Sequence, residues 1–168
     1  MVASHLFRNT STLSDNSKVE LPLLKIKNIL MAEDDDDDFN LFNAALLSLY
    51  SSVNVLRTEN GIMLTSLLET SLKPDVIFLD INLPFKSGFI CLQEIRNNVA
   101  TSDIKVVMYS TSNNEADVYK SYQLGANFYL VKPYTYPMIV RQFHHLFTNR
   151  YFITNTRPPI DNFLINYC

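Results

Sequence analysis

The chain has 168 residues, of which 47% are hydrophobic and 18% are charged, and its formal net charge is −3. This length suits one globular domain with a full-sized core, and because its Lys and Arg residues are scattered without forming a stripe, a nucleic-acid-binding protein is excluded. Its two cysteines, Cys91 and Cys168, lie far apart, which argues against a disulfide framework or a zinc site and predicts that Cys91 is a buried core thiol.

The first part of the chain predicts a flexible leader over residues 1–24. This segment is rich in Ser, Thr and Asn and has no hydrophobic periodicity. Its first dozen residues also lack the continuous apolar core of a secretory signal. We therefore expect the protein to be cytoplasmic.

From Lys25 onward, strand-like runs alternate with helical patterns. The expected strands are 28–32, 53–56, 76–79, 105–109 and 127–131. Apolar residues at helical spacing follow each strand, which predicts five helices. Strict alternation requires right-handed crossovers and a parallel sheet covered on both faces. The expected fold is therefore a flavodoxin-like α/β sandwich, (βα)5, with three layers and a five-stranded parallel sheet of order 2-1-3-4-5.

Two segments bear on how far this alternation extends: the uncharged stretch 39–56 and the chain after Arg150. The longest uncharged stretch, residues 39–56, contains several Asn and Ser residues that would be unpaired in lipid, so it predicts a helix running into a strand and no membrane span. After Arg150 the alternation stops. We expect a domain over residues 25–148 and a C-terminal tail over residues 149–168 with an apolar end at 163–165, for which the sequence indicates no docking place.

Acidic residues follow two of the predicted strands. Glu33 and Asp34 come after the first strand and Asp80 ends the third. In a sheet of this kind the carboxyl ends of these two strands meet where the strand order reverses. Three neighbouring carboxylates repel one another unless a cation holds them, and ligands that are all oxygen favour Mg²⁺, with Mn²⁺ as the second choice.

Two further residues suit phosphoryl transfer to a carboxylate at this edge. Such a reaction needs a fixed cation and hydrogen-bond donors around the transferring group. Lys132 follows the fifth strand, and Pro133 after it would tolerate a cis peptide that turns the ammonium inward. Ser110 ends the fourth strand with a hydroxyl.

These residues together resemble the receiver domain of response regulators. Glu33-Asp34, Asp80, Ser110 and Lys132-Pro133 match its acidic pair, phosphoacceptor, switch hydroxyl and lysine in order and spacing over about residues 26–148. The stretch INLPFKSG after Asp80 is similar to receivers that partner phytochrome-type histidine kinases. Ser110 stands where Thr is more usual, and Thr111 replaces a usual Ala.

The resemblance implies a function in two-component signal transduction. A phosphohistidine of a sensor histidine kinase or a histidine phosphotransfer protein would donate its phosphoryl group to Asp80. Mg²⁺ would be bound by Asp34, Asp80 and the backbone carbonyl of Asn82, while Glu33 would hold metal-bound water. Lys132 would pair with the phosphate. The chain would catalyse only its own phosphorylation and dephosphorylation and is otherwise expected not to be an enzyme.

The resemblance also implies a switch. Ser110 would move to hydrogen-bond the phosphate and let Tyr129 turn inward, which would change the surface of the fourth helix, fifth strand and fifth helix. That surface would bind a downstream protein target or a second copy of the chain in a homodimer. Because about twenty residues after Arg150 cannot build an output module, we expect the output to be such a contact or a phosphate relay.

Simpler readings remain for several residues. Asp36, Asp37 and Asp38 are best explained as the start of a helix, where acids favour the dipole. An inactive receiver kept as a scaffold is one alternative function. A phosphatase of the haloacid dehalogenase type is another, although that family resembles an Asp-x-Asp pattern at the first strand and Asn82 fills the second position here.

Overall fold

The computed structural model describes residues 26–50, 52–70 and 72–167, so the predicted leader over 1–24 lies outside the described residues. Within the described part, strands and helices alternate along the chain. The elements in order are β1 (Asn28–Ala32), α1 (Asp36–Leu49), β2 (Asn54–Thr58), α2 (Gly61–Leu68), β3 (Val76–Leu79), α3 (Gly88–Asn97), β4 (Lys105–Ser110), α4 (Glu115–Gln123), β5 (Phe128–Val131), α5 (Tyr136–Thr148), α6 (Arg150–Ile153), the 3-10 helix η1 (Ile160–Asn162) and β6 (Leu164–Ile165).

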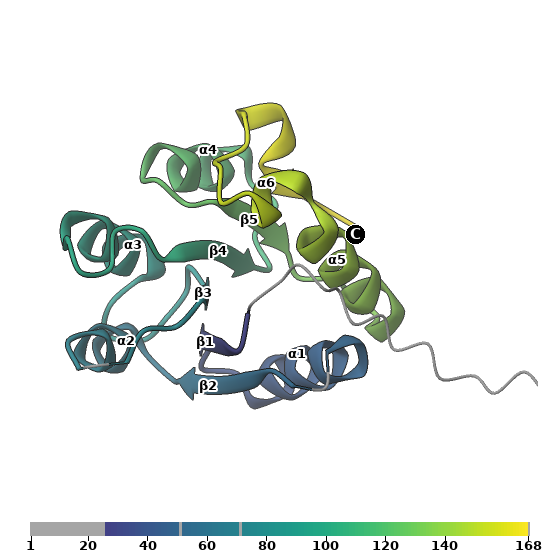
Figure 1. Cartoon of the computed structure of the whole chain (residues 1–168), viewed down its shortest axis with the longest axis horizontal. Coiled ribbons are helices and arrows are strands. Elements are labelled where there is room, and N and C mark those ends of the chain that lie inside the picture. Colours follow the sequence, from purple (N-terminus) through teal and green to yellow (C-terminus); the bar gives the residue numbers. More distant parts are fainter. Residues whose placement is uncertain (1–25, 51, 71, 168) are drawn as a thin grey trace, which may run out of the picture.

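The strands form one parallel sheet of order β2-β1-β3-β4-β5-β6. This confirms the flavodoxin-like order, but the predicted number of five strands is wrong by one. The sixth strand comes from the C-terminal tail, which runs beside β5 at the edge of the sheet (Figure 1). A strand of two residues has no periodicity that could announce it, because its place is decided by partners more than thirty residues earlier in the chain.

Helices cover both faces of the sheet (Figure 1). On one face, α1, α5 and α6 supply Phe42, Phe143 and Phe152 to a core that includes Met31 of β1. On the other face, α2, α3 and α4 pack against residues such as Leu30. Successive residues of β1 thus point to opposite faces, and both faces are buried, which explains the uninterrupted apolar strands. The predicted three-layer sandwich is confirmed.

The acidic run opens α1 as the sequence indicates. The carboxylate of Asp35 accepts a hydrogen bond from the backbone N–H of Asp38 at 2.9 Å, which caps the helix. Asp36, Asp37 and Asp38 form the first turn, where the helix dipole favours acids. In the described part of the chain, no helix is long and apolar enough to cross a membrane. Cys91 is fully buried, and burial raises the pKa of its thiol to about 11.

The tail folds back onto the domain after α5. Phe152 of α6 joins the core beside α1 and α5, while Phe163 joins the core on the opposite face. Ile165 of β6 is buried and Leu164 is half exposed, so one side of this short strand faces the protein. The tail thereby contacts both layers of helices at the edge of the sheet where β5 lies.

Candidate functional site

Four of the predicted site residues lie together at the carboxyl edge of the sheet. The ladder of backbone hydrogen bonds continues one residue past the strands and holds their backbones. The N–H of Asp80 donates to the carbonyl of Ala32 at 3.1 Å, and the N–H of Lys132 donates to the carbonyl of Ser110 at 2.9 Å. Because all strands are parallel, Glu33, Asp80, Ser110 and Lys132 emerge at the same edge, as the topology predicted.

The ammonium of Lys132 is the centre of the site. Its Nζ lies 2.8 Å from Oδ2 of Asp80, 2.6 Å from Oε2 of Glu33 and 2.8 Å from Oδ2 of Asp38. Asp80 and Lys132 are each 7% exposed and Glu33 is 1% exposed. Peptide bonds in the described residues are all trans, so the expected cis bond before Pro133 is not what turns the lysine inward.

The charges in this cluster are not balanced. Burial raises the pKa of Glu33 to about 7; the charge of Lys132 opposes this shift and the nearby Asp80 adds to it. Burial alone would lower the pKa of Lys132, but the charges of Asp80 and Glu33 and its hydrogen bonds to the acids raise that pKa above its ordinary value. One lysine thus serves three carboxylates, and a further cation would relieve their repulsion.

The predicted metal ligands lie only partly together. Asp34 is exposed at the rim, where its backbone carbonyl accepts a hydrogen bond from Arg57 Nη2 at 2.9 Å. The N–H of Asn82 donates to Oδ1 of Asp80 at 3.2 Å. Among the described residues, no three acidic, His or Cys side chains form a ready metal site. The donor set is chemically suited to Mg²⁺, since carboxylates and carbonyls are hard oxygen ligands, but Lys132 holds its buried members.

Asp38 is the site residue that sequence reasoning missed. We expected it to serve only the start of α1, yet its carboxylate contacts Lys132 from the first turn of that helix. Side chains on a helix lean toward its N-terminus, so the third residue after the cap Asp35 reaches back over the edge of the sheet. The position of Asp38, three residues after Asp35, is the sequence signal that could have indicated this reach toward the edge of the sheet. It was passed over because helix capping alone explains the acidic run.

Ser110 and Tyr129, the predicted switch residues, lie on the neighbouring strands β4 and β5. Ser110 is fully buried, and its Oγ accepts from the N–H of Ser112 at 3.5 Å. Tyr129 is also fully buried, and its hydroxyl donates to the carbonyl of Ser112 at 2.8 Å. Burial raises the pKa of Tyr129 to about 12. The tyrosine ring therefore occupies the inward position, bonded to the loop that follows Ser110, while Thr111 is exposed.

Gly88 holds the loop after Asp80 close to the end of β3. The N–H of Gly88 donates to the carbonyl of Ile81 at 2.9 Å. A Cβ atom at Gly88 would lie 2.0 Å from the backbone oxygen of Asp80, so only glycine permits this approach. The same loop presents Phe85 to solvent, 85% exposed and with a φ of 63°.

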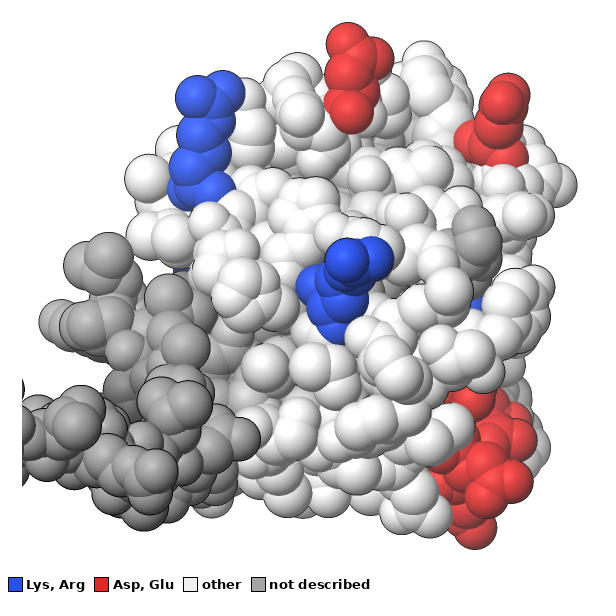
Figure 2. Space-filling view, turned by 90° about the vertical axis from the view of Figure 1, so that its right-hand side faces the viewer, with Lys and Arg blue, Asp and Glu red and all other residues white. Residues whose placement is uncertain are grey.

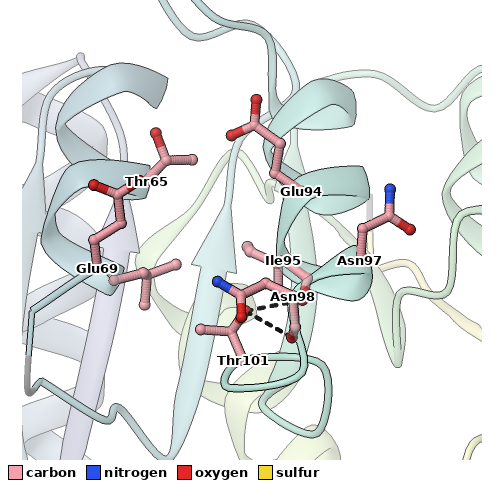
Figure 3. A pocket seen from close by; sticks show the side chains of 8 residues that line it. Thr65, Glu69, Glu94, Ile95, Asn97, Asn98 and Thr101 are labelled. Atoms are coloured by element: carbon pink, nitrogen blue, oxygen red, sulfur yellow. Dashed lines mark hydrogen bonds between the residues drawn. The ribbon is translucent and has the colours of Figure 1, made fainter.

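Two other surfaces do not bear on this site. A hollow between α2 and α3 is lined by residues that include none of the predicted site residues (Figure 3): Thr65, Leu68, Glu69, Glu94, Ile95, Asn97, Asn98 and Thr101. Figure 2 shows the side of the molecule on which α5 lies. Over the described part of that face, Lys and Arg side chains stand apart from one another and form no stripe.

Comparison with known proteins identifies relatives over the part of the chain that holds this site. Residues 29–144 match the family model described as the response regulator receiver domain. The response regulator Rcp1 of Synechocystis sp. is 37% identical over 112 residues, which make up 63% of this chain and 76% of that protein. The transcriptional regulatory protein KdpE of Staphylococcus aureus is 34% identical over 106 residues, or 63% of this chain and 43% of that protein.

Solved structures agree with these relatives. The phosphorylated cyanobacterial phytochrome response regulator RcpA has a TM-score of 0.67 at 31% identity, covering 73% of this chain and 93% of that chain. The Mn²⁺-bound form of response regulator Rcp1 has a TM-score of 0.66 at 31% identity, covering 79% of this chain and 99% of that chain. The similarity to phytochrome response regulators that the stretch after Asp80 indicated is confirmed.

Proposed function

This chain belongs to the response regulator receiver family, and we propose that it accepts a phosphoryl group on Asp80 from the phosphohistidine of a partner protein. The observation that carries the proposal is the buried pair of Lys132 Nζ and Asp80 Oδ2, 2.8 Å apart at the carboxyl edge of the sheet. A strand-ending carboxylate with a fixed ammonium beside it is what a phosphoryl acceptor requires.

The transfer step exchanges one bond to phosphorus for another. A carboxylate oxygen of Asp80 attacks phosphorus, the bond between phosphorus and the donor's imidazole nitrogen breaks, and the nitrogen keeps the electron pair. Lys132 pairs with the negative charge on the transferring group, and the Ser110 hydroxyl donates a hydrogen bond to it. Dephosphorylation is attack of water on the same phosphorus, which releases inorganic phosphate and restores the carboxylate.

We propose Mg²⁺ as the cofactor, with Mn²⁺ able to replace it, as the Mn²⁺-bound relative supports. Asp34, Asp80 and the backbone carbonyl of Asn82 would hold the ion, and Glu33 would hold its water. The ion would supply positive charge for the phosphoryl oxygens. The geometry supports this assignment, because the one ammonium of Lys132 lies within 2.8 Å of the carboxylates of Glu33, Asp38 and Asp80.

The proposed partners follow from the family and its relatives. A sensor histidine kinase, of phytochrome type by likeness to RcpA, or a histidine phosphotransfer protein would supply the phosphoryl group in the cytoplasm. A downstream protein would bind the surface formed by α4, β5 and α5. We take residues 25–148 as the receiver unit and residues 149–168 as a tail that belongs to its folded structure over the part described.

Incubation of the full chain with acetyl phosphate and Mg²⁺ tests the function. We expect a mass gain of about 80 Da on the intact protein, the mass of one phosphoryl group. The gain should vanish in Asp80→Asn and persist in the matched variant Asp37→Asn, which changes an exposed acid of the same region. A wild-type chain that gains no mass would instead be a scaffold, and rapid turnover of phosphate esters would identify a phosphatase.

A further inference from the structure

We infer that the C-terminal segment of residues 157–167 and the inward position of Tyr129 stabilise each other, so that this segment takes part in the switch. The inference rests on the proposed function, since it assumes that Tyr129 responds to phosphorylation of Asp80. It adds a third component, the segment that contains β6, to the pair of Ser110 and Tyr129.

Phe163 is the residue that links the tail to the switch. It is fully buried on the same face of the sheet as Tyr129, and the centroids of the two rings lie 6.5 Å apart. On its other side Phe163 packs edge-on against Tyr122 of α4, with ring centroids 5.1 Å apart. Its backbone carbonyl accepts a hydrogen bond from the N–H of Tyr129 at 3.0 Å.

The position of Phe163 restricts the tyrosine. β6 lies beside β5 on the outer edge of the sheet, with Leu164 opposite Tyr129 in the register. A Tyr129 ring that rotated toward this edge would enter the space that Phe163 fills. The docked tail therefore favours the inward ring, whose hydroxyl bonds to Ser112, and the inward ring in turn leaves room for Phe163.

Specific polar contacts hold the rest of the segment in place. The buried side chain of Gln142 in α5 donates from Nε2 to the carbonyls of Val131 at 2.8 Å and Ile165 at 3.0 Å, which ties β6 to β5. Arg157 lies over the ring of Tyr122 at 3.8 Å and donates from Nε to the carbonyl of Ala126 at 3.2 Å. These contacts span α4, β5 and α5, the three elements of the proposed output surface.

Linkage makes the coupling reciprocal. If the tail favours the inward ring, and phosphorylation of Asp80 favours the same ring position, each must strengthen the other by the same factor. A downstream protein, or a second copy in the expected homodimer, would then meet the tail as part of the α4, β5 and α5 surface. The segment would be held most tightly in the phosphorylated chain.

Titration with beryllofluoride and Mg²⁺, which mimics the phosphoryl group on a carboxylate, tests the coupling in the full chain by amide chemical shifts. We expect Phe163→Leu to weaken beryllofluoride binding about fivefold or more, the lower end of usual allosteric couplings. The matched control is Leu164→Ala, which truncates the next residue of the chain, a 41% exposed leucine, and should change the affinity less than twofold. Arg157→Ala, a change at an exposed position, loosens the segment without altering the core and should act in the same direction as Phe163→Leu.

The reciprocal measurement is hydrogen exchange of the amides of residues 164 and 165. Saturating beryllofluoride should slow this exchange in the wild-type chain by at least the factor of affinity lost in Phe163→Leu, and should leave it unchanged in Asp80→Asn. Equal affinities in all variants, with exchange indifferent to beryllofluoride, would overturn the coupling while the acetyl phosphate mass gain still upheld the phosphoacceptor. A wild-type chain with neither mass gain nor beryllofluoride shifts would overturn both.

Discussion

The ammonium of Lys132 contacts two buried carboxylates at once: its Nζ lies 2.8 Å from Oδ2 of Asp80 and 2.6 Å from Oε2 of Glu33. The same positive charge therefore stabilises the folded site and, under the proposed function, would pair with the phosphoryl group. Substitutions around this ammonium should separate the two roles, because stability and phosphorylation are measured independently.

Lys132→Met should destabilise the chain and strengthen its binding of Mg²⁺. Removing the ammonium leaves the buried carboxylates of Glu33 and Asp80 without their cation, and breaking a buried ion pair costs about 3 kcal/mol. Urea unfolding at pH 7 with and without MgCl₂ measures both effects, since Mg²⁺ should restore more stability to the variant than to the wild type. Lys120→Met, a change at an exposed lysine, is the control and should respond to Mg²⁺ as the wild type does.

Asp38→Asn should speed phosphorylation while leaving stability almost unchanged. The Asp38 side chain is 36% exposed, and an ion pair of that kind contributes less than about 1 kcal/mol. Its removal frees Lys132 to pair with the phosphoryl group, so we expect a rate gain of about two- to fivefold, the equivalent of that energy. Intact-mass kinetics with acetyl phosphate measure the rate.

The control for Asp38 is Asp37→Asn, which removes the same charge from an exposed neighbour in the first turn of α1. An equal acceleration in both variants would assign the effect to net charge. The contact between Asp38 and Lys132 would then have no part in it.

Without divalent metal, stability should fall as the pH rises from about 4.5 to about 7. The pKa of Glu33 is raised from 4.5 in the unfolded chain to about 7 in the folded one, so the folded state binds more protons across this window. The loss on raising the pH should be about 1 to 3 kcal/mol. Chemical unfolding at several pH values should show a flatter profile for Glu33→Gln, whereas Asp34→Asn at the exposed rim should keep the wild-type slope.

Gly88→Ala should destabilise the chain by about 3 kcal/mol or more and slow phosphorylation, because the new Cβ meets the backbone oxygen of Asp80 at 2.0 Å and the end of β3 must shift. Thermal unfolding and acetyl phosphate kinetics measure the two effects. Ser87→Ala is a close control, since Ser87 precedes α3 without a side-chain capping bond. A stable Gly88→Ala chain with normal kinetics would contradict the tight approach.

Tyr129→Phe should cost about 1 kcal/mol of stability, because it leaves the carbonyl of Ser112 without the hydroxyl that donates to it at 2.8 Å. The ring remains, so the packing of Phe163 should survive. Urea unfolding measures the loss, and Tyr134→Phe, at a residue 88% exposed, should change stability by less than about 0.5 kcal/mol. If both variants matched the wild type, the hydroxyl bond would contribute nothing.

The strands were predicted best where the hydrophobic pattern depends only on the residues of the strand itself. The strands expected at 28–32 and 76–79 coincide with β1 and β3, because burial on both faces makes every residue of these strands after the exposed Asn28 apolar. The end of β2 was placed too early, since Arg57 and Thr58 interrupt its apolar pattern while still pairing with β1. The gathering of Glu33, Asp80 and Lys132 followed from topology alone.

Features that depend on residues distant in the chain could not be predicted from the sequence. The role of Asp38 is visible only once Lys132 lies beside it, 94 residues later. The place of β6 depends on Gln142 and the free edge of β5, neither of which marks Leu164 or Ile165 as a strand. A second role of a side chain such as Asp38 cannot be predicted from the sequence when its local role, here at the start of a helix, already explains why the residue is there.

The position of β6 also affects the risk that the chain aggregates during synthesis. β5 is buried along its whole length, and until β6 pairs with it, one line of its backbone N–H and C=O groups is open to any other extended chain. β6 follows α5 and α6 in the chain, so it is synthesised after the other five strands, and the edge of β5 has no β6 to pair with until then. Weakening the tail should therefore reduce the yield of soluble protein during synthesis, even where the finished molecule tolerates the change.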